Sequence, residues 1–212
     1  RTLVICPASL KHQWKKEIEK FTDENATVVN GLPDERAEIY KTCTDYFLIV
    51  NYEMVLRDYH HLNKYFNDLI VLDEAQRIKN YETTTSYIMK KLHKRHALVI
   101  TGTPLENKLI DLYSITSFVD PDFLSPLWEF SYQHCYFDND KKNKIVVYHN
   151  LVELNKRMQN ILIRRETKDV IKQLPNLSQM DVPVEMHPDQ RSYHASMAQG
   201  VSKILRKKFI TP

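Results

Sequence analysis

The stretch Leu69-Ile-Val-Leu-Asp-Glu-Ala-Gln76 places four apolar residues directly before two adjacent carboxylates. An apolar run of this length is typical of a parallel strand that is buried on both faces, and open α/β sheets bind ligands at the carboxyl ends of such strands. Neighbouring side chains point to opposite sides, so Asp73 and Glu74 can have different roles. One can hold magnesium on the phosphates of a nucleotide, and the other can orient or deprotonate water. The alternative is a strand end with two solvated acids.

Short apolar runs alternate with amphipathic segments through the first hundred residues. This alternation predicts an α/β fold, with a parallel sheet flanked by helices. The predicted strands cover residues 3–6, 26–29, 47–50, 69–72 and 97–100.

Two helices are predicted between these strands. Apolar residues recur at helical spacing from Leu10 to Phe21, with Ser9 as the expected N-cap. The next helix is expected to begin at Pro33, where Asp34 and Glu35 favour the first turn.

The pattern changes after residue 104, and the segments that follow predict mostly helices. Helices are expected over 109–118, 151–163 and from Pro188, with an aromatic stretch from Trp128 to Tyr132. A polar loop is expected over 138–144 and a strand over 179–186. A domain boundary is placed near 174–176.

Composition excludes several classes of protein. The 212 residues include three glycines, Gly31, Gly102 and Gly200, and none of them forms a Walker A loop or a G-x-G-x-x-G motif. Three widely spaced cysteines without a C-x-x-C pair support neither a disulfide framework nor a thiolate zinc site, and favour a reducing, intracellular compartment. No apolar run approaches the roughly 18 residues that a membrane span needs.

Charge is distributed unevenly along the chain. Residues 1–140 carry 16 basic and 21 acidic side chains, whereas residues 141–212 carry 14 basic and 6 acidic ones. The basic C-terminal third favours contact with a polyanion, although a solvated basic face explains it equally well.

A second strand end, residues 97–104, supports a site at the edge of the sheet. Its glycine-containing turn is flanked by Thr101 and Thr103, whose hydroxyls could bond to Asp73 or Glu74 on the neighbouring strand. A tight turn capped by threonines is the alternative.

Four stretches at the predicted strand ends resemble motifs of one family. They are Leu3-Val-Ile-Cys-Pro-Ala-Ser-Leu-Lys-His-Gln-Trp14, Ile49-Val-Asn-Tyr-Glu-Met54, Asp73-Glu-Ala-Gln-Arg-Ile-Lys-Asn80 and Thr101-Gly-Thr-Pro-Leu-Glu-Asn107. They are similar to motifs Ia, Ib, II and III of the first motor lobe of a Swi/Snf-family DNA-dependent ATPase, within the superfamily 2 helicase-like proteins. The spacing of the last two makes this resemblance specific.

The resemblance implies a RecA-like lobe that couples hydrolysis of ATP, with Mg²⁺, to movement along duplex DNA. Asp73 would bind magnesium through water, with the ATP, and Glu74 would activate the attacking water. The implied coupling residues are Gln76, Arg77, Thr101, Gly102 and Thr103. The implied DNA-facing residues are Pro7, Ser9, Leu10, Asn51, Tyr52 and Asn107, whereas Trp14 is expected to pack on the buried face of its helix.

The resemblance also implies how the chain is organised. Residues 1–120 would form the RecA-like lobe without its phosphate loop, 121–174 a helical insertion or interlobe region, and 175–212 the start of a second lobe. Motif I is expected before Arg1 and the second-lobe arginines after Pro212, so the fragment alone is expected to be inactive. Expected partners are duplex DNA and a DNA-bound protein or polymerase, in the bacterial nucleoid or the eukaryotic nucleus, with no membrane and no structural metal.

Two other functions stay open. The chain could be a degenerate lobe that only binds nucleic acid or protein. It could also belong to an RNA helicase of the same superfamily, although Thr-Gly-Thr-Pro and the Arg-Ile-Lys-Asn extension favour the Swi/Snf pattern over the Ser-Ala-Thr type.

Overall fold

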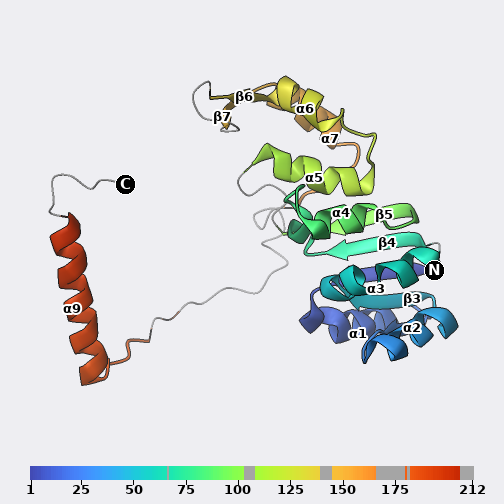
Figure 1. Cartoon of the computed structure of the whole chain (residues 1–212), viewed down its shortest axis with the longest axis horizontal. Helices are drawn as coiled ribbons and strands as arrows, with labels where there is room; N and C mark the ends of the chain where they lie inside the picture. The colour runs from blue at the N-terminus through green and yellow to red at the C-terminus, as the bar shows by residue number, and fades with distance from the viewer. Residues whose placement is uncertain (66, 103–107, 139–144, 166–179, 181, 206–212) are drawn as a thin grey trace. The chain divides into compact units, whose positions relative to one another are not determined.

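The computed structural model describes residues 1–65, 67–102, 108–138, 145–165, 180 and 182–205 (Figure 1). The chain divides into two compact units, Arg1–Asn160 and Ile161–Pro212. The candidate site lies in the first unit.

A five-stranded, entirely parallel sheet forms the centre of the first unit, with the strand order β2-β3-β1-β4-β5. All five strands predicted from the sequence are confirmed. They are β1 (Thr2–Cys6), β2 (Ala26–Val28), β3 (Phe47–Asn51), β4 (Asn67–Asp73) and β5 (Lys94–Ile100). Because every neighbouring pair is parallel, the carboxyl ends of β1, β3, β4 and β5 meet at one edge of the sheet.

Alternate residues of the central strands are buried on opposite faces of the sheet. Leu3 and Ile5 of β1 face a cluster with residues of α2 (Pro33–Thr42), α3 (Tyr52–Lys64), α4 (Thr84–Lys90) and α5 (Leu109–Val119). Val4 and Cys6 face the other cluster, which includes Ile18 of α1 (Lys11–Phe21). Burial on both faces explains why these strands read as continuous apolar runs.

Among the strands that the structure describes, β5 lies at an edge of the sheet. Its Leu98 and Ile100 side chains are 49% and 40% exposed. This edge therefore presents apolar surface.

The start of α1 differs from the prediction. Ser9 lies inside a 3₁₀ turn, η1 (Ala8–Leu10), and the N-cap residue of α1 is Leu10, without a side-chain cap. The predicted Ser9 cap is therefore wrong. Lys11 instead anchors this end of the helix, because its buried ammonium donates to the Val29 carbonyl at 2.8 Å.

The predicted start of α2 is confirmed. Pro33 is the first residue of the helix, with Asp34 and Glu35 in its first turn. The Glu35 carboxylate accepts a hydrogen bond from the Leu32 backbone N–H at 2.7 Å. This bond satisfies one of the backbone donors that the helix start leaves open.

Beyond α5, the first unit contains more than the expected helices (Figure 1). Along the chain, an antiparallel hairpin of β6 (Cys135–Phe137) and β7 (Ile145–Tyr148) follows α6 (Leu127–His134) and precedes α7 (Leu151–Met158). The sequence did not predict this hairpin, and the helix predicted over 151–163 ends at Met158. Most of the predicted polar loop, residues 139–144, lies outside the described residues.

The second unit contains α9 (Pro188–Leu205), as predicted. The predicted strand over 179–186 is wrong for the residues described there, 180 and 182–186, which have no regular secondary structure. In the part of the chain that the structure describes, no helix is both long and apolar enough to cross a membrane.

Candidate functional site

Four strand ends bring polar groups together at the carboxyl edge of the sheet. Asp73 ends β4 beside Ile100 of β5, and Asn51 ends β3 beside Cys6 of β1. The convergence that the sequence predicted from separate strand ends is therefore present.

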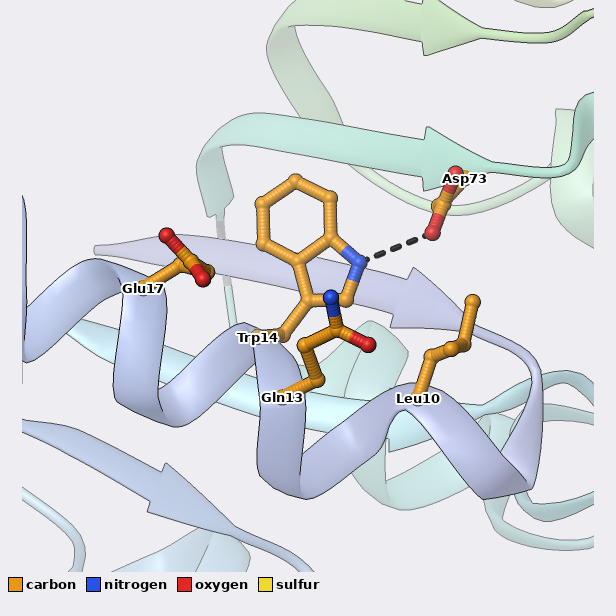
Figure 2. Close-up of a pocket in the computed structure, with 5 residues that line it drawn as sticks. All are labelled: Leu10, Gln13, Trp14, Glu17 and Asp73. Atoms are coloured by element: carbon orange, nitrogen blue, oxygen red, sulfur yellow. Dashed lines mark hydrogen bonds between the residues drawn. The ribbon is translucent and has the colours of Figure 1, made fainter. Parts of the chain in front are cut away.

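The Asp73 carboxylate accepts a hydrogen bond at each oxygen. The indole N–H of Trp14 donates to Oδ2 at 2.8 Å, as Figure 2 shows, and the backbone N–H of Glu74 donates to Oδ1 at 2.9 Å. The Tyr52 hydroxyl donates to the Asp73 backbone carbonyl at 2.7 Å. Side chains of α1 and α3 thus hold the end of β4 from two directions.

A chain of hydrogen bonds joins Glu74 to the end of β5. The Gln76 amide donates to the Glu74 carboxylate at 2.5 Å, and the Thr101 hydroxyl donates to the Gln76 amide oxygen at 2.8 Å. The sequence predicted direct bonds from the threonines to the acids. The structure instead inserts Gln76 between Thr101 and Glu74, whereas Thr103 lies outside the described residues.

Glu74 has a left-handed backbone conformation, with φ at 54°. Such a conformation is uncommon for a residue with a side chain, and it is frequent at functional sites. It turns the chain from β4 into the 3₁₀ turn η2 (Ala75–Ile78), and this turn brings Gln76 back toward Glu74.

Glu53 is a polar residue of this edge that the sequence analysis missed. Its carboxylate accepts hydrogen bonds from the Asn51 amide at 2.6 Å and from Arg77 at 2.9 Å, and the Arg77 guanidinium lies over the Tyr52 ring. The hydrogen bond from its own backbone N–H and that from Asn51 lower the pKa of Glu53. Its position one residue after Tyr52 in motif Ib was the available signal.

Burial keeps two neutral groups near Asp73 in their protonated forms. Burial, reinforced by the negative charge of Asp73, raises the pKa of the Cys6 thiol to about 12. Burial and the same carboxylate raise the pKa of Tyr52 well above its usual value. The Cys6 thiol and the Tyr52 hydroxyl therefore add no charge beside Asp73 at neutral pH.

A small hollow of about 180 Å³ lies beside Asp73. Its lining residues are Leu10, Gln13, Trp14, Glu17 and Asp73 (Figure 2). Ligand pockets usually measure about 300–1,000 Å³, so the hollow is smaller than a nucleotide site.

The carboxylate oxygens at this edge are suitable ligands for the magnesium ion that accompanies a bound nucleotide. Mg²⁺ is commonly held by one or two carboxylates together with water and substrate phosphates, rather than by a cage of protein ligands. Asp73 offers such a carboxylate, with lone pairs beyond the two that its hydrogen bonds use. Among the described residues, no group of three or more metal-binding side chains gathers in one place.

The predicted DNA-facing residues differ in exposure. Ser9 is exposed in η1, and Pro7 and Leu10 are partly buried beside it. Asn51 and Tyr52 are 8% and 2% exposed, so their side chains serve the interior of this edge. Asn107 lies outside the described residues.

Comparisons with known proteins identify the family of this chain. The SNF2-related domain family matches residues 1–211. An ATP-dependent helicase of Mycoplasma pneumoniae is 35% identical over 96% of this chain and 19% of its own length. The ISWI chromatin-remodeling complex ATPase ISW1 of Saccharomyces cerevisiae is 32% identical over 93% of this chain and 18% of its own length.

Solved structures of SWI2/SNF2 ATPase cores resemble this chain as well. The Sulfolobus solfataricus SWI2/SNF2 ATPase core in complex with dsDNA is 29% identical, with a TM-score of 0.66, and the match covers 100% of this chain and 43% of that one. The parallel sheet with flanking helices is therefore the RecA-like lobe of a SWI2/SNF2 ATPase core. The chain belongs to the SNF2-related domain family, and it spans about a fifth of the length of the curated relatives named above.

Proposed function

We propose that this chain is part of the ATP-hydrolysing lobe of a motor that moves along duplex DNA and remodels protein–DNA complexes inside the cell. The observation that carries the proposal is the bonded chain Thr101–Gln76–Glu74 next to Asp73. It supplies a metal-binding carboxylate, a second carboxylate for water, and a fixed link from that carboxylate to the neighbouring strand. The relatives, which are named as an ATP-dependent helicase and a chromatin-remodeling ATPase, support the same function.

In this proposal the two carboxylates divide the work. Asp73 would hold magnesium, through water, against the phosphates of ATP, where the ion would supply charge neutralisation. Glu74 orients the attacking water and accepts its proton. Gln76 fixes the Glu74 carboxylate, and Thr101 fixes Gln76, so a movement of the β5 end would change the position of the catalytic base.

The exposed turn at η1 is the proposed contact with DNA. Ser9 offers a hydroxyl there and Ala8 is exposed beside it. Hydroxyl and backbone N–H groups bind phosphate without reading sequence, which is what a motor that moves along DNA requires. The DNA complex of the Sulfolobus solfataricus core supports duplex DNA as the polymer.

Replacing the proposed base tests the function. In the intact protein, Glu74→Gln is expected to abolish DNA-stimulated ATP turnover while ATP binding persists, because the amide keeps its shape and loses its basicity. Glu19→Gln is the matched control, since Glu19 is exposed on α1. Unchanged turnover in Glu74→Gln would refute the assigned role.

The 212-residue chain by itself is expected to show no meaningful turnover. Its three glycines form no phosphate-binding loop of the Walker type, so the β- and γ-phosphates lack a cradle within these residues. ATPase assays of this chain with and without duplex DNA test the expectation, and robust DNA-stimulated hydrolysis would contradict it. If the intact protein bound DNA without hydrolysing ATP, the degenerate binding lobe would be the better description.

A further inference from the structure

Trp14 connects two motifs that lie 59 residues apart in the sequence. Its indole N–H donates to Asp73 Oδ2 at 2.8 Å, and its ring packs against the core cluster that contains Val4 and Ile18. The sequence predicted only the packing. Because a packed ring cannot swing freely, the packing also fixes the direction of the N–H.

The two donors on Asp73 constrain it differently. The Glu74 N–H belongs to the adjacent residue, so it moves together with Asp73 and cannot hold the carboxylate relative to another element. Trp14 belongs to α1, which packs on one face of the sheet. The indole therefore holds the carboxylate relative to α1.

The same helix leads directly to the exposed turn η1. Leu10 ends this turn, and its N–H donates to the Pro7 carbonyl at 2.9 Å. Leu10, Trp14 and Asp73 line one hollow (Figure 2), so the turn, the helix and the carboxylate surround a common space. α1 begins at the residue after η1, so the turn and Trp14 lie on one continuous stretch of helical backbone.

We propose that Trp14 is a positioning residue: it holds the Asp73 carboxylate for the metal and couples it to the Ala8–Leu10 turn. This inference rests on the proposed function, because it needs Asp73 to bind magnesium and η1 to bind DNA. Asp73 would then bind magnesium most tightly when DNA holds the turn, and DNA would bind most tightly when magnesium and nucleotide are present, since such coupling is reciprocal.

The first experiment examines the contact without any metal or nucleotide. The intact protein is labelled with 5-fluorotryptophan, and the ¹⁹F signal of Trp14 is identified by its absence in Trp14→Phe. Asp73→Ala is expected to shift this signal, whereas Glu19→Ala, on the same helix, is expected to leave it in place. An unshifted signal in Asp73→Ala would overturn the inference.

The second experiment measures binding rather than turnover. The Mg²⁺ concentration for half-maximal binding of a fluorescent, non-hydrolysable ATP analogue is determined in the intact protein, with and without duplex DNA. Trp14→Phe keeps an aromatic ring in the cluster and loses the donor that orients the carboxylate, so this concentration is expected to rise on the order of tenfold, as when a hydrogen bond that orients a metal ligand is removed. DNA is expected to lower it in the wild type and to have little effect in the variant.

Two further variants separate positioning from general damage. Trp14→His retains an N–H donor and is expected to recover part of the magnesium affinity. Trp128→Phe removes an exposed tryptophan of α6 and is expected to match the wild type. If the wild type binds the analogue with magnesium and Trp14→Phe gives the same values with the same DNA effect, the inference fails while the proposed function stands. If the wild type shows no magnesium-dependent binding, both fail.

Discussion

The buried ion pair between α2 and α3 allows a quantitative prediction for the free energy of unfolding. Arg36 donates to both Asp58 oxygens at 2.6 and 2.7 Å, and the Tyr40 hydroxyl donates to Oδ2 at 2.8 Å. The two charged side chains are 6% and 7% exposed. Asp58→Ala leaves the guanidinium buried without its counter-ion, and breaking a buried pair from one side costs about 3–5 kcal/mol.

This cost is a large part of the roughly 5–15 kcal/mol by which a domain is usually stable. Urea denaturation of the protein and its variants measures it. Glu19→Ala is the control, because it breaks an exposed Lys15–Glu19 pair with a separation of 3.5 Å, which is worth about 0.3–0.5 kcal/mol. A loss below about 1 kcal/mol in Asp58→Ala would refute the reasoning.

Three further predictions concern acid stability, the proposed catalytic base and the proposed contact with DNA. Burial alone raises the pKa of Asp58, but its hydrogen bonds from Arg36 and Tyr40 outweigh burial and lower it. Ionised Asp58 therefore stabilises the fold above about pH 4, and this contribution is lost as the pH falls through the lower pKa of the folded state. In urea denaturation at a series of pH values, Asp58→Asn should reduce the loss of stability on the acid side. Gln76→Ala should reduce ATP turnover of the intact protein about tenfold with unchanged ATP affinity. Gln76→Glu places a second negative charge beside Glu74 and should not restore turnover. Wild-type turnover in Gln76→Ala would contradict the role given to the hydrogen-bonded chain from Thr101 to Glu74. In fluorescence anisotropy, Ser9→Glu should weaken the affinity for duplex DNA roughly tenfold, with the largest effect at low salt. Thr42→Glu, at the far end of α2, should leave this affinity unchanged. Equal effects of the two substitutions would argue against η1 as the contact with DNA.

The central sheet and the two carboxylates could be predicted because both depend on local sequence. Strands buried on both faces are continuous apolar runs, and parallel pairing alone brings their polar ends to one edge. The hairpin of β6 and β7 escaped prediction because its strands have three and four residues and little apolar alternation. The run 179–186 alternates like a strand but forms none among its described residues, since alternation does not supply a partner.

The contacts that define the site could not be read from spacing. The bond from Trp14 to Asp73 depends on how α1 is placed over β1 and β4, and nothing in an apolar periodicity says where an indole N–H points. The position of Gln76 between Thr101 and Glu74 likewise depends on the left-handed backbone of Glu74. Motif resemblance identified these residues, but only the fold gives their partners.

The open edge at β5 affects how the isolated chain can be handled. Unpaired strand edges recruit other strands, and natural proteins often protect them with charged residues. Lys94 and Arg95 place such charges at the beginning of β5, but Ala97-Leu-Val-Ile100 leaves its carboxyl half without any. We therefore expect preparations of these 212 residues alone to aggregate edge to edge as their concentration rises, and Leu98→Lys to reduce this aggregation.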